Sequence, residues 1–487
     1  MPSFKEIPYY QFLNKPVGKE VRLENLVVHG TIPEEIRGSH YRAVPDPMFD
    51  PRFGDDTLLS DDGMISRLDI SDSGVNFEIK YVQTARHQAE EAAGKALFGR
   101  YRNPYTDLPE VEGVDRTVSN TTPVFHAGKL LMTKEDGLPY QVDPFTLETL
   151  GRYDFDGAIR SETMTAHVRI DPASQKMYFY GYEADGLASN TVSYCVADAN
   201  GKLISEQFFE NKYCAMMHDF LISENYAVIP TFPTKADIER LKAGGAHWAH
   251  DQEDDSWIGL IPRDGSVDDM RWYKGPKGVH SFHMMNAFEQ DGAVHMDVHM
   301  FASNAFEFVR EAGGIHIPQQ QVGGAFERWT MDLAEGVEEV RITPMGPPGD
   351  MPRIADADMG RPYANGWYLT VNPEGPPPLL GGPVGSLFNM IMQINAQAGQ
   401  VVGARQMPPA HAISELVHIP SKQEGHMGYL MAVVDQQVGD DEYLHETWIL
   451  DANNINADPL ARIEIPHRLR PQVHGWWVSQ EALEAAK

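Results

Sequence analysis

Cysteine is nearly absent from this chain of 487 residues, which contains only Cys195 and Cys214. Two thiols cannot build a disulfide scaffold or a zinc cluster held by thiolates alone. We expect both to be small buried side chains in a reducing compartment. A tight metal site would therefore have to be built from imidazole and carboxylate groups.

The sequence also lacks clusters of positive charge and long apolar runs. Its 40 Lys and Arg against 70 Asp and Glu give a formal net charge of −30. Such a surface repels nucleic-acid phosphates and anionic lipids. No apolar run approaches the roughly 20 residues that span a bilayer, and residues 1–6 do not resemble a signal peptide. We expect a cytoplasmic protein with no nucleic-acid partner and no stable membrane insertion.

Short strand patterns separated by turns fill most of the chain, and helical patterns are few. Many short strands predict an all-β barrel, sandwich or propeller, without choosing among them. Examples of predicted strands are Lys129–Thr133, Lys176–Gly181, Tyr226–Pro230, Gly428–Val434 and Glu446–Leu450. Helices are predicted over Arg86–Phe98, Thr234–Ala243 and Ser479–Ala486, with Thr234 as an N-cap.

Two stretches rich in glycine and proline, Thr343–Arg353 and Asn372–Gly385, are predicted to be long loops. Loops of this length in a compact protein are often functional or cover a site. No Pro/Ser-rich linker divides the sequence. We therefore expect residues 1–487 to form a single domain.

Nineteen histidines are the main source of candidate metal ligands. As a strand, residues 294–300 would place His295, Asp297 and His299 on one face, with the two histidines about 13 Å apart, too far to share a metal. We interpret this run as a polar face, and His247 and His250, beside an acidic stretch, as a solvated surface. Ten others are expected to be surface or hydrogen-bonded structural residues: His29, His40, His87, His126, His316, His411, His418, His426, His445 and His467.

Four further histidines stand in more informative contexts: His167, His218, His283 and His474. They are 51, 65 and 191 residues apart, too distant for a local finger-type motif. Taken singly, each would more often be structural. In a radially repeated fold, however, distant strands converge on one axis, and each can offer one inward side chain.

An ordered succession of motifs containing these histidines resembles the carotenoid-cleavage oxygenase family along almost the whole chain. The motifs are Gly38–Arg42, Asp61–Ile65, Ser119–Thr122, Lys129–Leu131, Glu135–Tyr140, Leu147–Gly151, Ala166–His167, His218–Phe220, Leu260–Arg263, Phe282–His283, Asn286–Glu289, Ser414–Glu415, Ile449–Ala452, Pro459–Ala461 and His474–Gly475. The resemblance implies a seven-bladed β-propeller with a loop-and-helix cap over the iron-bearing face.

The resemblance further implies an iron(II) ion, Fe(2+), held by the four histidines. Four neutral imidazoles leave the ion its full charge and leave positions open for dioxygen, whereas a four-coordinate zinc site would be closed. The family orients its ligands with three glutamates, and two match here at Glu135 and Glu415. The third position is matched by Asp350, whose shorter side chain predicts a backbone shift or a bridging water.

Within the family, residues 98–107 and the pair Lys134–Glu135 resemble the bacterial lignostilbene dioxygenases. That branch implies cleavage of the central C=C bond of a 4-hydroxystilbene by O2, giving two aromatic aldehydes. Tyr101 and Lys134 would contact the 4-hydroxyl and stabilise a phenolate, and Leu59 occupies a position that is often aromatic. Neighbouring strand residues point to opposite faces, so placing Lys134 and Glu135 in one site predicts a bulge or a strand end there.

Three other functions stay open at this point. An apocarotenoid-cleaving dioxygenase is the alternative within the family. A metal-dependent propeller hydrolase or lactonase would favour oxygen ligands over four histidines. A propeller without activity would serve as a binding module. The oligomeric state is not fixed by the sequence, and a homodimer is one alternative.

Overall fold

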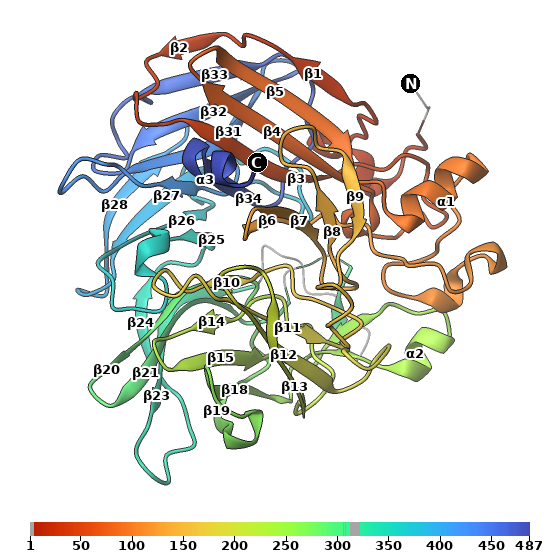
Figure 1. Ribbon diagram of the computed structural model, residues 1–487, viewed down its shortest axis with the longest axis vertical. Coiled ribbons are helices and arrows are strands. Elements are labelled where there is room, and N and C mark those ends of the chain that lie inside the picture. Colours follow the sequence, from red (N-terminus) through yellow and green to blue (C-terminus); the bar gives the residue numbers. More distant parts are fainter. Residues whose placement is uncertain (1–3, 305, 307, 312–321) are drawn as a thin grey trace.

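The computed structural model describes residues 4–304, 306, 308–311 and 322–487. Seven sheets of four or more strands surround one axis (Figure 1). The strands β16 (Thr234–Ala236), β17 (Trp248–His250) and β22 (Arg310–Glu311) form a separate three-stranded sheet. This arrangement confirms the all-β, seven-bladed propeller, which the pattern of strands alone left undecided.

Five blades are made of strands that follow one another along the chain, from the axis outward. Their bounds are β6 Thr122–His126, β7 Lys129–Thr133, β8 Tyr140–Val142 and β9 Thr149–Arg152; β10 Arg169–Ile170, β11 Met177–Tyr182, β12 Thr191–Ala197 and β13 Leu203–Glu210; β14 Leu221–Ile222, β15 Tyr226–Thr231, β18 Asp255–Pro262 and β19 Arg271–Lys277; β20 Met284–Gln290, β21 Ala293–Phe301, β23 Gly324–Asp332 and β24 Arg341–Gly346; β25 Asp350–Arg353, β26 Asn365–Thr370, β27 Met390–Asn395 and β28 Gln400–Gln406.

The remaining two blades combine strands from both ends of the chain and so close the ring. One contains β34 Gly475–Ser479, β3 Gly38–Pro45, β4 Gly63–Ser71, β5 Gly74–Tyr81 and β1 Val21–Leu23. The other contains β29 His411–Ile413, β30 Val417–Ile419, β31 Tyr429–Gln437, β32 Tyr443–Asp451, β33 Ala461–Ile465 and β2 Val28–Gly30. Red and blue segments lie side by side at this closure (Figure 1).

The core lies between the blades, because each sheet packs a face against each neighbour. All six residues of β11 are buried, with no alternation between an inner and an outer face. Between the blades of β15 and β21, Tyr273, Met296 and Trp329 are fully buried in one cluster. The inner edges of the blades are thereby held rigidly around the axis.

Three α-helices lie outside the blades, at Ala85–Ala93 (α1), Ile238–Lys242 (α2) and Gln480–Ala485 (α3). The C-terminal helix confirms the prediction, with Ser479 as its N-cap. The first helix ends earlier than predicted, because Gly94 takes a left-handed conformation (φ 66°) that terminates it. The second prediction was wrong at its start: Thr234 begins the short strand β16 (Thr234–Ala236), and Asp237 caps α2.

The cap over one end of the axis includes short 3-10 helices at Pro8–Tyr10, Phe12–Asn14 and Leu58–Ser60, together with the loop that contains residues 372–385. That loop was predicted correctly, since its only regular feature is one isolated bridge at Leu380. The other predicted loop, Thr343–Arg353, was wrong, because it contains the end of β24 and all of β25. The small sheet of β16, β17 (Trp248–His250) and β22 (Arg310–Glu311) was not predicted.

Candidate metal centre and adjoining cavity

One polar residue of each blade lies within three positions of the start of an innermost strand, where the blades converge. The seven residues are Thr121, His167, His218, His283, Asp350, Glu415 and His474. The sequence separation of the four histidines is therefore set by the length of whole blades. Local spacing rules for metal motifs cannot find such a site.

The four histidines point their ring nitrogens at one another on the axis. His218 Nε2 lies 3.1 Å from the Nε2 atoms of His167 and of His283, and His283 Nε2 lies 3.1 Å from that of His474. One ligand atom from each residue lies within 4.8 Å of all the others. This grouping confirms that the four residues converge and leaves His295 and His299 out of the cluster.

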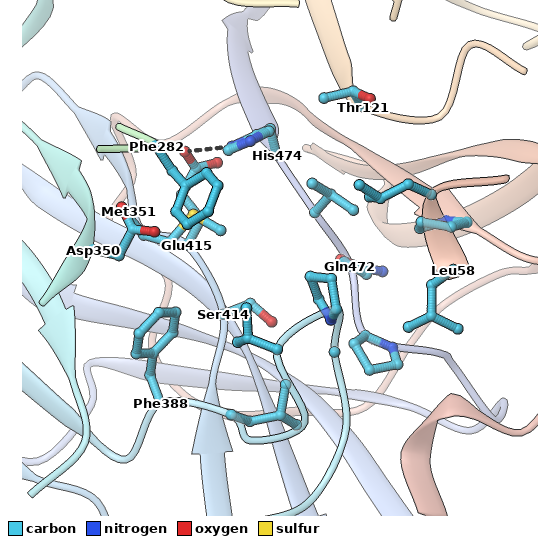
Figure 2. Close-up of a pocket in the computed structure, with 18 of the residues that line it drawn as sticks. Leu58, Thr121, Phe282, Asp350, Met351, Phe388, Ser414, Glu415, Gln472 and His474 are labelled. Atoms are coloured by element: carbon cyan, nitrogen blue, oxygen red, sulfur yellow. Dashed lines mark hydrogen bonds and ion pairs between the residues drawn. The ribbon is translucent and has the colours of Figure 1, made fainter. Parts of the chain in front are cut away.

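Three of the four imidazoles have a carboxylate on the opposite ring nitrogen. His218 Nδ1 lies 3.2 Å from Glu135, His283 Nδ1 lies 2.8 Å from Asp350, and His474 Nδ1 lies 3.0 Å from Glu415. Figure 2 shows the contact between Glu415 and His474 as a dashed line. A carboxylate on Nδ1–H fixes the ring and leaves the Nε2 lone pair free for a metal.

The electrostatics of these groups fit a bound cation. Burial lowers the pKa of His167 well below its usual value and lowers the pKa of His474 to about 4. Burial would raise the pKa of Glu135, but the adjacent His218 outweighs it and lowers that pKa to about 2. His167 and His474 are therefore neutral and Glu135 is charged at pH 7. Converging Nε2 lone pairs repel one another unless a cation lies between them, so the residues present fit a metal ion.

The Asp350 carboxylate contacts His283 directly. A bridging water, one of the two ways in which the shorter side chain could reach the ligand, is not needed. The pairing between β25 and β26 shifts register between Asp350 and Arg353, and Met351 takes a left-handed conformation with φ 51°. A bulge of this kind bends the strand and redirects its side chains. The bulge lies beside Asp350, whose contact with its histidine is the shortest of the three.

A cavity opens onto the cluster beside His218, His283 and His474. Figure 2 shows Leu58, Phe282 and Phe388 around it, with His474 at one end. Its apolar wall is built by Leu58, Leu59, Met216, Phe282, Phe306, Val384, Leu387, Phe388 and Ile413. The predicted loop 372–385 contributes Gly382, Pro383 and Val384, so this loop does cover the candidate site.

Lys134 and Leu59 line this cavity, as expected from the resemblance. Strand β7 ends at Thr133, so Lys134 and Glu135 lie in the following turn and both reach the site. Lys134 is 2% exposed, and its Nζ donates to the Leu59 carbonyl at 3.1 Å. Burial lowers the pKa of the Lys134 ammonium, and Asp136 and Glu135 partly oppose that effect.

Tyr101 packs against Lys134 but, among the described residues, is not part of the cavity wall itself. Its ring centroid lies 5.3 Å from the Lys134 Nζ and 5.5 Å from the ring of Phe308. Its hydroxyl is buried, and the Arg102 side chain is its polar neighbour. Burial raises the pKa of Tyr101 well above its usual value, so the hydroxyl stays a neutral donor.

The aromatic part of the wall comes from Phe282, Phe306 and Phe388, which the sequence reasoning did not select. Leu59 leaves the expected aromatic position aliphatic, and these three phenylalanines supply rings elsewhere on the wall. Phe282 directly precedes His283, and this adjacency was the one sequence signal that pointed to it.

One expectation about other histidines was wrong. His247 and His250 are not solvated: they are 2% and 1% exposed, and His247 Nε2 lies 3.1 Å from Glu183. The run from His295 to His299 forms part of β21 and lies outside the axial cluster, as predicted, and Asp297 and His299 are fully buried. Asp297 binds Arg328 at 2.7 Å. His316 lies outside the described residues, and both cysteines are buried and free, as predicted.

Residues 14–479 match the family model described as retinal pigment epithelial membrane protein (RPE65). The chain belongs to this family, the carotenoid oxygenases. The match covers both ends of the propeller and all four axial histidines. It confirms the resemblance that the ordered motifs indicated.

Several curated relatives and solved structures are similar to this carotenoid oxygenase over nearly its whole length. It is 35% identical to lignostilbene-α,β-dioxygenase isozyme III of Sphingomonas paucimobilis, over 97% of each chain. It is 36% identical to isoeugenol monooxygenase of Pseudomonas nitroreducens, over 95% of this chain and 96% of the relative. The crystal structure of Pseudomonas brassicacearum lignostilbene dioxygenase superimposes with a TM-score of 0.93 at 34% identity, covering 98% and 100% of the chains.

Apocarotenoid oxygenase of Synechocystis shares the fold, with a TM-score of 0.81 at 22% identity over 96% of this chain and 97% of that one. No helix among the described residues is long and apolar enough to cross a membrane.

Proposed function

We propose that His167, His218, His283 and His474 hold iron(II) and that Glu135, Asp350 and Glu415 orient three of these ligands. A bound iron(II) supplies a place where dioxygen is activated for reaction with an alkene. Four imidazoles with no carboxylate among them support this metal, and they argue against the oxygen-rich site of a hydrolase or lactonase.

The substrate that we propose is a 4-hydroxystilbene, whose central C=C bond is cleaved by O2. The two alkene carbons each gain one oxygen atom, and the products are two aromatic aldehydes. The observation that carries this proposal is the buried ammonium of Lys134 in a largely apolar wall. Among the described residues only the Leu59 carbonyl accepts from its Nζ, which leaves two N–H groups for a ligand.

Lys134 and Tyr101 have the chemistry to bind the phenol oxygen of such a substrate. Loss of the phenol proton pushes electron density through the ring into the alkene, which makes the alkene reactive. An ammonium and a neutral hydroxyl at the phenol oxygen stabilise the developing phenolate in a site from which water is excluded. Leu59 would contact the same ring as an aliphatic surface.

Oxygen uptake by the iron-loaded protein tests the proposal on three substrates. A 4-hydroxystilbene should be consumed with one O2 per alkene and give two aldehydes. Its 4-methoxy analogue has no phenol proton to lose and should react at least a hundredfold more slowly. Equal rates on both stilbenes would exclude phenolate activation, and preference for an apocarotenal would identify the alternative within the family.

A phenylpropene with a 4-hydroxyl group, such as isoeugenol, is a second candidate. It has the same phenol-activated alkene but lacks a second aromatic ring. Two relatives named isoeugenol monooxygenase are 36% and 34% identical to this chain, and Leu59 gives less ring stacking than an aromatic residue there. Including isoeugenol in the same oxygen-uptake assay ranks the two substrates by kcat/KM.

A further inference from the structure

A buried carboxamide without a partner lies in the wall of the cavity, away from the groups assigned above. Gln472 is 8% exposed, and neither its Oε1 nor its Nε2 has a hydrogen-bond partner among the described residues. Figure 2 shows its side chain between Leu58 and Ser414, on the segment that leads to His474. Leaving both amide atoms of a buried glutamine unpaired is unfavourable, so this position fits a polar group of a ligand.

Gln472 and His474 are two positions apart on an extended segment and line the same cavity, so one ligand can contact both. The backbone before His474 pairs with β3, since Val473 donates to the Ala43 carbonyl and Ala43 donates to that of His474. An extended chain rises about 3.3 Å per residue, which separates Gln472 and His474 by about 7 Å along the wall. That is close to the length of one aromatic ring with its oxygen substituent.

The charges near Gln472 favour a neutral ligand group over an anion. Arg470 also lines the cavity, and its Nη2 has no hydrogen-bond partner among the described residues. Its guanidinium, however, already faces two carboxylates, Asp61 at 2.8 Å and Asp46 at 4.0 Å. Arg470, Asp46 and Asp61 together therefore have no net positive charge that would attract a carboxylate or a phenolate. A carboxamide that both donates and accepts is matched by a hydroxyl, which does the same.

We propose that Gln472, with Arg470 beside it, forms a second polar subsite that selects substrates bearing an additional hydroxyl group. This inference rests on the proposed cleavage of 4-hydroxystilbenes, in which Lys134 binds the first hydroxyl. The additional hydroxyl lies either on the same ring or on the ring across the alkene. A methoxyl at that place accepts a hydrogen bond but cannot donate one, so it satisfies only the Nε2 side of the amide.

The test compares 4-hydroxystilbene with compounds that carry a second hydroxyl at the 3, 3′ or 4′ position, and with their methoxy counterparts. For at least one position the wild type should favour the hydroxyl by roughly ten- to a hundredfold in kcat/KM. In Gln472→Met the ratio of hydroxylated to unsubstituted substrate should fall to near one. Gln472→Glu, which accepts but does not donate, should keep preference for the hydroxyl and reject the methoxyl more strongly.

Ser414→Ala is the matched control, because it removes a different polar group from the same wall and should leave the hydroxyl preference intact. A wild type without any hydroxyl preference overturns the proposal, and the Gln472 site then holds only water. An equal loss on all substrates in Gln472→Met also overturns it, because a merely structural residue would not change the ratio.

Anaerobic binding separates this inference from the proposed function. Quenching of tryptophan fluorescence in the iron-loaded protein measures Kd for the same compounds without turnover. A hydroxyl preference in Kd that Gln472→Met abolishes supports the subsite even if no stilbene is cleaved in air. Cleavage with no preference in Kd or kcat/KM would sustain the proposed function and refute the subsite.

Discussion

Replacing Lys134 by methionine should remove most of the activity on a 4-hydroxystilbene while leaving the site intact. Methionine keeps much of the length of the side chain but removes the ammonium. The fold should tolerate the change, because methionine fills a similar volume and the lost Nζ makes one hydrogen bond, to the Leu59 carbonyl. At 2% exposure, water has little access with which to replace the lost donor.

The size of the effect follows from the number and burial of the N–H groups. One of the three N–H groups of Nζ is donated to Leu59 at 3.1 Å, so the other two are the ones that a substrate oxygen would use. Removing one preorganised donor from a buried site costs about a hundred- to a thousandfold in kcat, or about 2.7–4 kcal/mol. Because this contact strengthens as charge develops, kcat should fall more than KM rises.

Steady-state oxygen consumption with two substrates and two proteins forms a cycle that isolates the contact. On the 4-hydroxy compound, the Lys134→Met protein should be much less active than wild type. On the 4-methoxy compound, whose reaction does not use the ammonium, the two proteins should have similar low activities. Lys129→Met, on the same hairpin and outside the cavity wall, is the control and should behave as wild type. Retention of more than a third of kcat by Lys134→Met, or an effect confined to KM, would refute the reasoning.

Two further predictions concern the metal. His218→Ala should bind far less iron, measured by metal analysis after anaerobic purification, whereas His299→Ala should keep it, since His299 lies outside the axial cluster; full iron content in His218→Ala would exclude that residue as a ligand. Asp350→Asn should lower iron affinity by about 10–100-fold, as loss of a carboxylate behind a histidine ligand does. Asp350→Glu should not restore it, because the bulge at Met351 is fitted to the shorter side chain; a glutamate variant with wild-type affinity would show that the bulge is unrelated to side-chain length.

Much of the strand content was predictable, because turn residues interrupt β-rich runs at regular intervals. Lys129–Thr133 was correct to the residue, and Glu446–Leu450 lies inside β32. The number of blades was not predictable from the strand pattern. The ring is closed by pairing between β3 and β34, whose residues are more than 400 positions apart, and no local pattern indicates that pairing. Thr234 was misassigned because pairing with β17 outweighs its capping propensity.

The axial histidines were found through ordered motifs, whereas burial could not be read from composition. His247 stands beside acidic residues, which indicated a solvated loop, yet Glu183 and the Arg102 carbonyl enclose it in the structure. The alternating strand places Asp297 on a polar face, but the alternation does not show that this face is buried. The two partners of Asp297, Arg328 and Tyr363, are distant in sequence, and no local pattern announces them.

The metal centre and the substrate wall differ in how strongly the fold constrains them. The metal centre uses positions where rigid blades converge, so the backbone of the propeller determines the geometry of the four histidines. Part of the wall is built by side chains from separate segments outside the named strands, among them Leu59, Phe388 and Gln472. Substituting one of these changes the shape or polarity of the cavity without moving a blade. Two relatives are named for lignostilbene and for isoeugenol, and we expect residues of the cavity wall, rather than the axial histidines, to decide between such substrates in this chain.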